Sequence, residues 1–130
     1  MATLSPSYVL KTFNNHFDDF VGDILRVFPG DKDIIAGREA LRNMRKANPK
    51  IIINIFKETV VGPYHKQIKN NDISFFIEKN YTDEITDENS RRILSKIDII
   101  REPVRNMNDA DKNNVLKYLN NLLKLCDLYK

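Results

Sequence analysis

The stretch Ala47–Val61, ANPKIIINIFKETVV, decides the fold class of this chain. Its run of isoleucines, taken alone, is typical of a buried β-strand. Asn48 followed by Pro49 favours a helix instead, because asparagine is a good N-cap and proline suits the first helical position. The apolar residues that follow recur at the spacing of one helix face: Ile53, Phe56, Val60, Tyr64 and Ile68. We therefore predict a helix over residues 49–70.

Helical periodicity also runs through most of the remaining chain, whereas period-two alternation is scarce. Caps and breakers divide the pattern into about six helices. Their expected starts are Ser5, Asp33, Asn48, Asp72, Thr86 and either Asn108 or Asp109. The second helix is expected to end near Lys46. Pro63 and Pro103 each lack a backbone N–H, so we expect a bend or an interruption at Pro63 and a second kink at Pro103.

The size and composition of the chain agree with a helical domain. Its 130 residues include only four glycines, which are few for a sheet protein with tight hairpins. The apolar fraction of 42% and the charged fraction of 30% are typical of a globular protein rather than a disordered one. We predict an all-α fold: a single compact bundle of about six helices over residues 1–130, with the apolar helix near 49–70 at its centre.

Ile52 and Ile55 extend the apolar surface of the 49–70 helix beyond one side. Such a helix lies either at the centre of a bundle or in an interface. We favour the central position, and it stays open whether this side is covered by the fifth and sixth helices or by another molecule. Phe75 and Phe76 are adjacent and cannot point the same way, so one of them can face a partner. The candidate partner-binding residues, for a protein partner or a symmetric homodimer, are Ile52, Ile55 and Phe75.

Basic residues are concentrated between positions 31 and 57, where seven lysines and arginines stand against three acidic residues. Most of them follow one side of the expected second helix, at spacings of i, i+4, i+7 and i+8. Such a stripe can bind phosphates, so a nucleic-acid-binding module is the alternative function. The competing interpretation is a solvated helix face, with which the acidic segment 72–90 could also pair. The residues of this alternative site are Arg38, Arg42, Arg45, Lys46 and Lys50.

The sequence contains no pattern typical of a catalytic centre, since its glycines are dispersed and no serine stands in a nucleophile elbow. His16 and His65 are far apart in sequence. His16 has Asp19 and Asp23 one and two turns on, but one histidine with scattered acids is a weak metal set, and we expect His16 to face solvent. Cys126 lies on the apolar stripe of the last helix, so we expect its thiol to be buried and to behave as a small hydrophobic side chain. We therefore predict a non-enzymatic protein without catalytic residues, metal or cofactor.

The single cysteine excludes an internal disulfide and favours a reducing compartment. The N-terminal residues lack the basic start and apolar run of a signal peptide, and no segment reaches the roughly 18–20 apolar residues of a membrane span. The sequence therefore predicts an intracellular, cytoplasmic protein with no membrane partner. Asn, Ile and Lys are common, and their A/T-rich codons point to an A/T-rich genome.

This residue bias is accompanied by four strings: RVFPGD (26–31), RKANPK (45–50), FFIEKNY (75–81) and IREPVRNM (100–107). Together they resemble small uncharacterised helical proteins encoded by large DNA viruses of algae and protists, from Phe13 to about Tyr129. The resemblance implies an intracellular viral product without a membrane anchor, in the host cytoplasm or the virion. It implies no activity, because that family has none assigned. We therefore expect a protein that docks a partner or itself through apolar helix surface.

Overall fold

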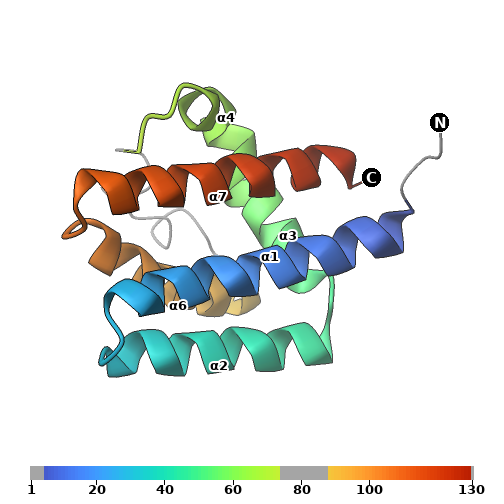
Figure 1. Cartoon of the computed structure of the whole chain (residues 1–130). Helices are drawn as coiled ribbons and strands as arrows, with labels where there is room; N and C mark the ends of the chain where they lie inside the picture. Colours follow the sequence, from blue (N-terminus) through green and yellow to red (C-terminus); the bar gives the residue numbers. More distant parts are fainter. Residues whose placement is uncertain (1–4, 74–87, 130) are drawn as a thin grey trace.

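The computed structural model describes residues 5–73 and 88–129 (Figure 1). These ranges form α1 (Pro6–Val27), α2 (Lys32–Ala47), α3 (Ile51–Phe56), the π-helical turn η1 (Lys57–Val61), α4 (Gly62–Lys69), α6 (Glu88–Val104) and α7 (Asp109–Leu128). No strand occurs in them, and the predicted all-α class is confirmed. No helix in these ranges is both long enough and apolar enough to cross a membrane. The helix expected after Asp72 and the cap expected at Thr86 lie outside the described residues.

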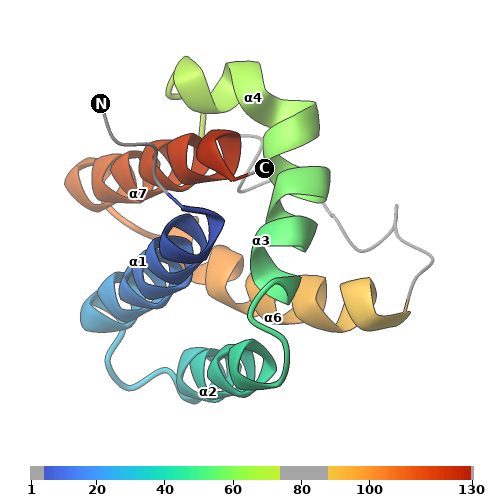
Figure 2. The ribbon, with the colours of Figure 1, turned by 90° about the vertical axis from the view of Figure 1, so that its right-hand side faces the viewer.

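Three long helices, α1, α2 and α7, run roughly along one direction, with α1 between the other two (Figure 1). Figure 2 shows the α3–η1–α4 unit crossing them steeply. α1 makes its most extensive contacts with α7 and also packs on α2, while α2 packs on α6. One side of α1 therefore forms a long seam with α2.

The caps of α1 and α2 agree closely with the sequence signals. Ser5 caps α1, because its Oγ accepts a hydrogen bond from the backbone N–H of Tyr8 at 3.1 Å. Asp31 caps α2 by accepting from N–H groups of the first turn, including that of Asp33 at 2.9 Å. α2 consequently begins at Lys32, one residue before the expected start, since the cap is Asp31.

The 47–61 stretch is helical, as predicted, but α3 begins at Ile51 and not at Pro49. Asn48 ends α2 instead of capping α3, because its backbone N–H donates to the Met44 carbonyl at 2.9 Å. Its Oδ1 accepts from the backbone N–H of Lys50 at 3.1 Å. Asn48 and Pro49 therefore form the turn between the two helices, and the second helix starts two residues later than the capping signal indicated.

The predicted bend at Pro63 takes the form of the π-helical turn η1. The backbone N–H of Gly62 donates to the carbonyl of Lys57, five residues earlier, and Tyr64 has the non-helical angles φ −118° and ψ 22°. Pro63 has no N–H to continue the α-helical ladder, which accounts for the local change of hydrogen-bond period. The helix predicted over 49–70 is thus α3, η1 and α4 joined end to end.

Aromatic and aliphatic side chains of α1 and α3 form the centre of the bundle. The rings of Phe13 and Phe17 lie 5.7 and 5.9 Å from the ring of Phe56, measured between centroids. Four side chains of the short helix α3 are buried: Ile52, Ile53, Ile55 and Phe56. α3 is therefore the central apolar helix that the sequence predicted.

The second predicted kink, at Pro103, is absent because α6 ends one residue later, at Val104. The Pro103 carbonyl accepts from the backbone N–H of Asn106 at 3.0 Å, so a tight turn replaces the helix. Asn108 then caps α7, as expected, by accepting from the backbone N–H of Asp111 at 2.8 Å. Pro103 thus stands in the last turn of a helix, where it ends the helix instead of bending it.

Candidate functional site

The predicted partner-binding residues Ile52 and Ile55 are buried in the core, with 3% and 7% of their surface exposed. Ile52 lines a small cavity together with Phe17 and Leu41, so α1 and α2 lie over it. We expected either the fifth and sixth helices or another molecule to cover this side of the helix. At Ile52, the first two helices cover it instead. Phe75 lies outside the described residues. Neither isoleucine offers a docking surface in this fold, because the central position of α3 buries both.

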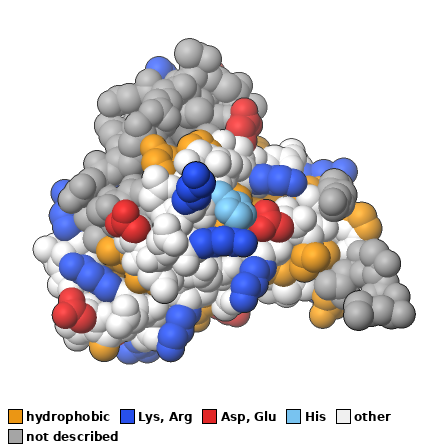
Figure 3. All heavy atoms as spheres, turned by 90° about the horizontal axis from the view of Figure 1, so that it is seen from above, with side chains coloured by type: hydrophobic (Ala, Val, Ile, Leu, Met, Phe, Trp, Pro, Cys, Tyr) orange, Lys and Arg blue, Asp and Glu red, His pale blue; other side chains and the backbone are white. Residues whose placement is uncertain are grey.

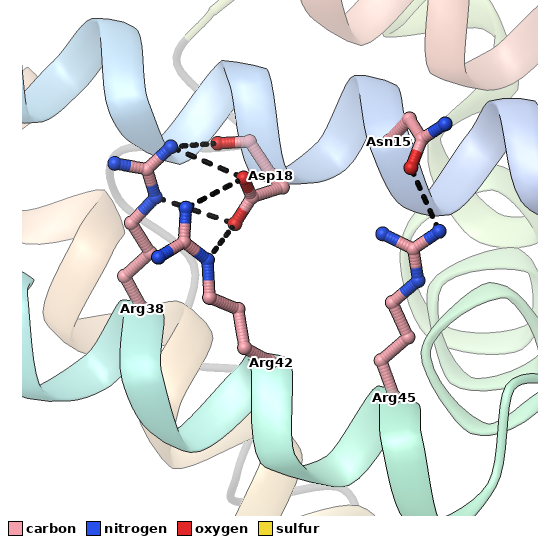
Figure 4. Close-up of polar contacts among 5 residues, drawn as sticks. All are labelled: Asn15, Asp18, Arg38, Arg42 and Arg45. Carbon is pink, nitrogen blue, oxygen red and sulfur yellow. Dashed lines mark hydrogen bonds and ion pairs between the residues drawn. The ribbon is translucent and has the colours of Figure 1, made fainter.

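The basic stripe of α2 faces α1, where Asp18 receives two of its arginines (Figure 4). Arg42 holds the Asp18 carboxylate with two parallel hydrogen bonds, from Nε to Oδ1 at 2.8 Å and from Nη2 to Oδ2 at 3.0 Å. Arg38 donates to the same carboxylate at 3.1 and 3.3 Å, and to the Asp18 backbone carbonyl at 3.3 Å. One carboxylate therefore joins two guanidinium groups across the α1–α2 seam. We call these three residues the Asp18 clamp.

The charges of the Asp18 clamp reinforce one another. Partial burial alone raises the pKa of the Asp18 carboxyl, but hydrogen bonds from Arg42 and Arg38 outweigh burial, so this pKa lies below its ordinary value. The hydrogen bond to Asp18 is also the main cause that raises the pKa of Arg42. Both groups are therefore charged at neutral pH. Bidentate charge-assisted pairs of this kind are among the stronger hydrogen bonds in proteins.

Gly22, one turn along α1 from Asp18, leaves room for the Arg38 guanidinium. A Cβ atom at Gly22 would lie 2.7 Å from Nη2 of Arg38, closer than a Cβ atom approaches another heavy atom. Glycine inside a helix is otherwise less favourable than alanine by roughly 1 kcal/mol. A Cβ atom at this position would therefore require the end of the Arg38 side chain to shift.

The other residues of the predicted nucleic-acid site have no carboxylate partner among the described residues. Nη2 of Arg45 donates to the neutral Oδ1 of Asn15 at 2.7 Å (Figure 4). Lys46 and Lys50 are exposed. The predicted set therefore divides: two of its arginines belong to the Asp18 clamp, and Arg45, Lys46 and Lys50 stay available to a ligand. The candidate site is therefore the surface around Arg45 and Lys46, and not the whole basic stripe.

Beyond the clamp the α1–α2 seam opens into a groove of about 560 Å³. Apolar atoms come from Leu10 and Pro49, and no acidic side chain is among the described residues that line it. Its four basic side chains are Lys11, Arg42, Arg45 and Lys46. We call this site the basic groove. It combines an apolar part with a basic rim, which is an arrangement suited to binding a ligand that is both apolar and negatively charged.

Asn14 connects the basic groove to the turn that follows α2. Its side chain is only 3% exposed, and its Nδ2 donates to the backbone carbonyl of Pro49 at 2.9 Å. Sequence reasoning missed Asn14, Lys11 and Asp18, although a signal was present. The three residues follow i, i+3 and i+7 on α1 and therefore project from one face of that helix.

A second concave surface, of about 500 Å³, lies near the start of α2 and the end of α6. Three of its four acidic side chains have structural roles: Asp31 caps α2, Asp98 forms an ion pair with Arg101 at 2.7 Å, and Glu102 forms one with Arg105 at 3.5 Å. No group of side chains in the described part of the chain has the composition of a metal site. We therefore assign no binding or catalytic role to this surface.

The titratable groups that the sequence singled out take part in packing. His16 is half-buried against Tyr118 of α7, with 4.9 Å between ring centroids, and does not face solvent as expected. Burial lowers the pKa of His16, while Asp19 acts in the opposite direction. His65 lies on α4, with its Nε2 3.3 Å from an α7 carboxylate. Cys126 is buried in the core, as expected, and burial raises the pKa of its thiol to about 12.

No family model matches the chain, and comparisons with curated proteins and with solved structures find no match either. A fold class alone does not specify a function. The proposal below is therefore based on the residues and geometry of the basic groove.

Proposed function

We propose that this protein is a non-enzymatic helical interaction module that docks a segment of a partner protein in the basic groove. The supporting observation is that apolar and basic side chains meet there in one concave site, with Leu10 and Pro49 beside Lys11, Arg45 and Lys46. Binding sites are typically concave and largely apolar, with a few placed polar groups that orient the ligand.

Two of the four basic side chains of the groove, Arg42 and Arg45, are positioned before a partner arrives. The Asp18 carboxylate holds Arg42 at 2.8 and 3.0 Å, and the Asn15 amide holds Arg45 at 2.7 Å. Side chains that are already ordered lose less conformational entropy on binding, which favours affinity. Elsewhere, the large apolar side chains that are exposed in the described residues lie on three different helices. They are Tyr8, Ile35 and Leu128.

A nucleic-acid-binding module is the alternative, with Lys46 and Lys50 as its most accessible cations. Arg38 and Arg42 would have to leave the Asp18 carboxylate in order to bind phosphates, which weakens this alternative. Figure 3 shows the molecule from above, where basic side chains are interspersed with acidic ones and a histidine. The described part of that face therefore adds no continuous basic surface for a nucleic-acid backbone.

Affinity capture from cells that express the protein tests the proposal, with nuclease-treated and untreated lysates compared. The groove variant carries Lys11→Glu and Lys46→Glu. The control variant carries Lys66→Glu and Lys124→Glu, which reverse the same charge at exposed positions on α4 and α7. We expect a protein partner that survives nuclease treatment, is lost with the groove variant and is retained by the control variant. Release by nuclease, or equal loss with both variants, would contradict docking in the groove.

A further inference from the structure

We infer that the occupant of the basic groove is an acidic peptide segment that carries aliphatic side chains. This inference rests on the proposed docking function and adds the chemistry of the partner. Two properties of the groove carry it: positive charge that no carboxylate among residues 5–73 and 88–129 neutralises, and apolar surface between the charged groups.

The positive charge of the groove exceeds what its described neighbours balance. The Asp18 clamp holds two guanidinium groups with one carboxylate, and Glu39 also acts on Arg42. Lys11, Arg45 and Lys46 form no ion pair with any described residue. Three such cations around one concave site favour a partner that brings carboxylates to the rim, since complementary charges guide encounter and fix orientation.

The dimensions of the groove limit how much of a partner it can hold. Its α1 side extends from Ser7 to Asn14, which is roughly 10 Å at a helical rise of about 1.5 Å per residue. This length corresponds to about three residues of an extended strand, at roughly 3.3 Å per residue. The occupant is therefore a short segment, with aliphatic side chains on Leu10 and Pro49 and carboxylates beside the lysines.

The lining of the groove favours a peptide over a nucleic acid. Among the described residues that line it there is no aromatic side chain, so these residues offer no stacking surface of the kind on which single-stranded bases bind. A phosphate backbone would satisfy the cations but would leave Leu10 and Pro49 in contact with water. An acidic segment with aliphatic side chains satisfies both parts of the site, because it buries the apolar atoms while its carboxylates pair with the cations.

Fluorescence anisotropy on the full chain tests the inference, with a short labelled peptide in which glutamates flank a pair of leucines. We expect saturable binding that weakens as salt is added and is reduced roughly tenfold or more in the groove variant. The control variant should bind this peptide as the wild type does. Two further peptides, with glutamine for glutamate or serine for leucine, should each bind more weakly. Circular dichroism of every variant checks that the helices are retained.

Several outcomes would overturn the inference: equal binding of the glutamine peptide, equal loss in the groove and control variants, or tighter binding of a single-stranded oligonucleotide. Self-association that the groove variant abolishes would assign the site to a second copy of the chain instead. The acidic peptide can also fail while affinity capture still returns a protein that the groove variant loses. In that case the docking function stands and the chemistry inferred for its occupant is wrong. Failure of both experiments rejects the groove as a docking site.

Discussion

Asp18 and Arg42 form a bidentate ion pair across the α1–α2 seam, with N–O distances of 2.8 and 3.0 Å. The two residues are 24 positions apart, so the pair joins two helices and not two turns of one helix. Arg38 shares the same carboxylate, and loss of that charge would leave two guanidinium groups close together. The clamp therefore sets how α2 lies against α1, and with it the position of the neighbouring basic groove.

Neutralising the clamp carboxylate should destabilise the fold. We expect Asp18→Asn to lower the free energy of unfolding at pH 7 by about 1–2 kcal/mol, because charge-assisted hydrogen bonds are lost. The effect is limited since the Arg42 side chain is 45% exposed and solvent screens the pair. Urea unfolding followed by circular dichroism measures it. Asp19→Asn, at the exposed neighbouring position, should change stability by less than about 0.5 kcal/mol.

The stabilisation that Asp18 contributes should also disappear in acid. Its pKa in the folded chain lies below the ordinary value of 3.8, so the unfolded chain takes up the proton first. The contribution is therefore complete above that ordinary value and is lost as the pH falls through the folded-state pKa. The wild type and Asp18→Asn should converge in stability at the acid end of a urea series. A difference that persists there would mean that the carboxylate charge is not its source.

Gly22 and Arg38 should be energetically coupled, because a Cβ at Gly22 would lie 2.7 Å from the guanidinium. In the wild type, Gly22→Ala displaces Arg38 from Asp18, which offsets the gain in helix propensity. In the Arg38→Ala background that conflict is absent, and Gly22→Ala should stabilise the fold by about 1 kcal/mol. A double-mutant cycle of urea unfolding measures the coupling. Additivity within roughly 0.3–0.5 kcal/mol would argue against the proposed contact.

The helices could be predicted from the sequence because caps and periodicity are local properties. Ser5 and Asn108 cap the helices expected of them, and Pro63 interrupts the expected helix. Asn48 was assigned to the wrong helix, because an asparagine side chain can cap a helix or stabilise a turn with the same oxygen. The kink expected at Pro103 failed for a related reason, since a proline ends a helix as readily as it bends one.

The site could not be predicted to the same extent, because it depends on which helices become neighbours. The basic stripe was visible at helical spacing, but its carboxylate, Asp18, is 20 and 24 positions away from the arginines that it binds. The acidic segment 72–90 was the more obvious partner by charge, and most of it lies outside the described residues, in which α1 supplies the carboxylate. Burial of Ile52 likewise depends on α1 and α2 lying over α3, which no local pattern specifies.

His16 should make the fold less stable as the pH falls below neutrality. Burial against Tyr118 lowers its pKa in the folded chain, although Asp19 partly opposes this. The unfolded chain then gains its proton near the ordinary value of 6.5, before the folded chain does. The contribution of neutral His16 to the free energy of unfolding is therefore complete above pH 6.5 and is lost as the pH falls through the folded-state pKa. His16→Phe, which keeps a ring beside Tyr118, should reduce the slope of stability against pH between roughly 5 and 7.

Urea unfolding at several pH values measures that slope for the wild type and His16→Phe. His65→Gln serves as the control, since His65 lies on α4, beside an α7 carboxylate, and leaves His16 in place. The slope for this variant should stay steeper than that for His16→Phe, because His16 is still present in it. A slope reduced equally by both substitutions, or by His65→Gln alone, would remove His16 as the cause.

Asn71 ends α4 in the left-handed backbone region, with φ at 57°. The backbone N–H of Asp72 donates to the Gln67 carbonyl at 2.9 Å and that of Asn71 to the Ile68 carbonyl at 3.1 Å, which is a Schellman motif. Oδ1 of Asn71 also accepts from Nδ2 of Asn120 at 3.1 Å, so the side chain ties this helix end to α7.

Comparing alanine with glycine at Asn71 isolates the backbone contribution. Both substitutions lose the hydrogen bond to Asn120, but only alanine carries a Cβ into the left-handed conformation. We expect Asn71→Ala to be less stable than Asn71→Gly by about 1 kcal/mol in urea unfolding. Asn71→Gly should in turn differ from the wild type mainly by the lost hydrogen bond. Equal stability of the two variants would show that the left-handed backbone at this position is not required for the end of α4.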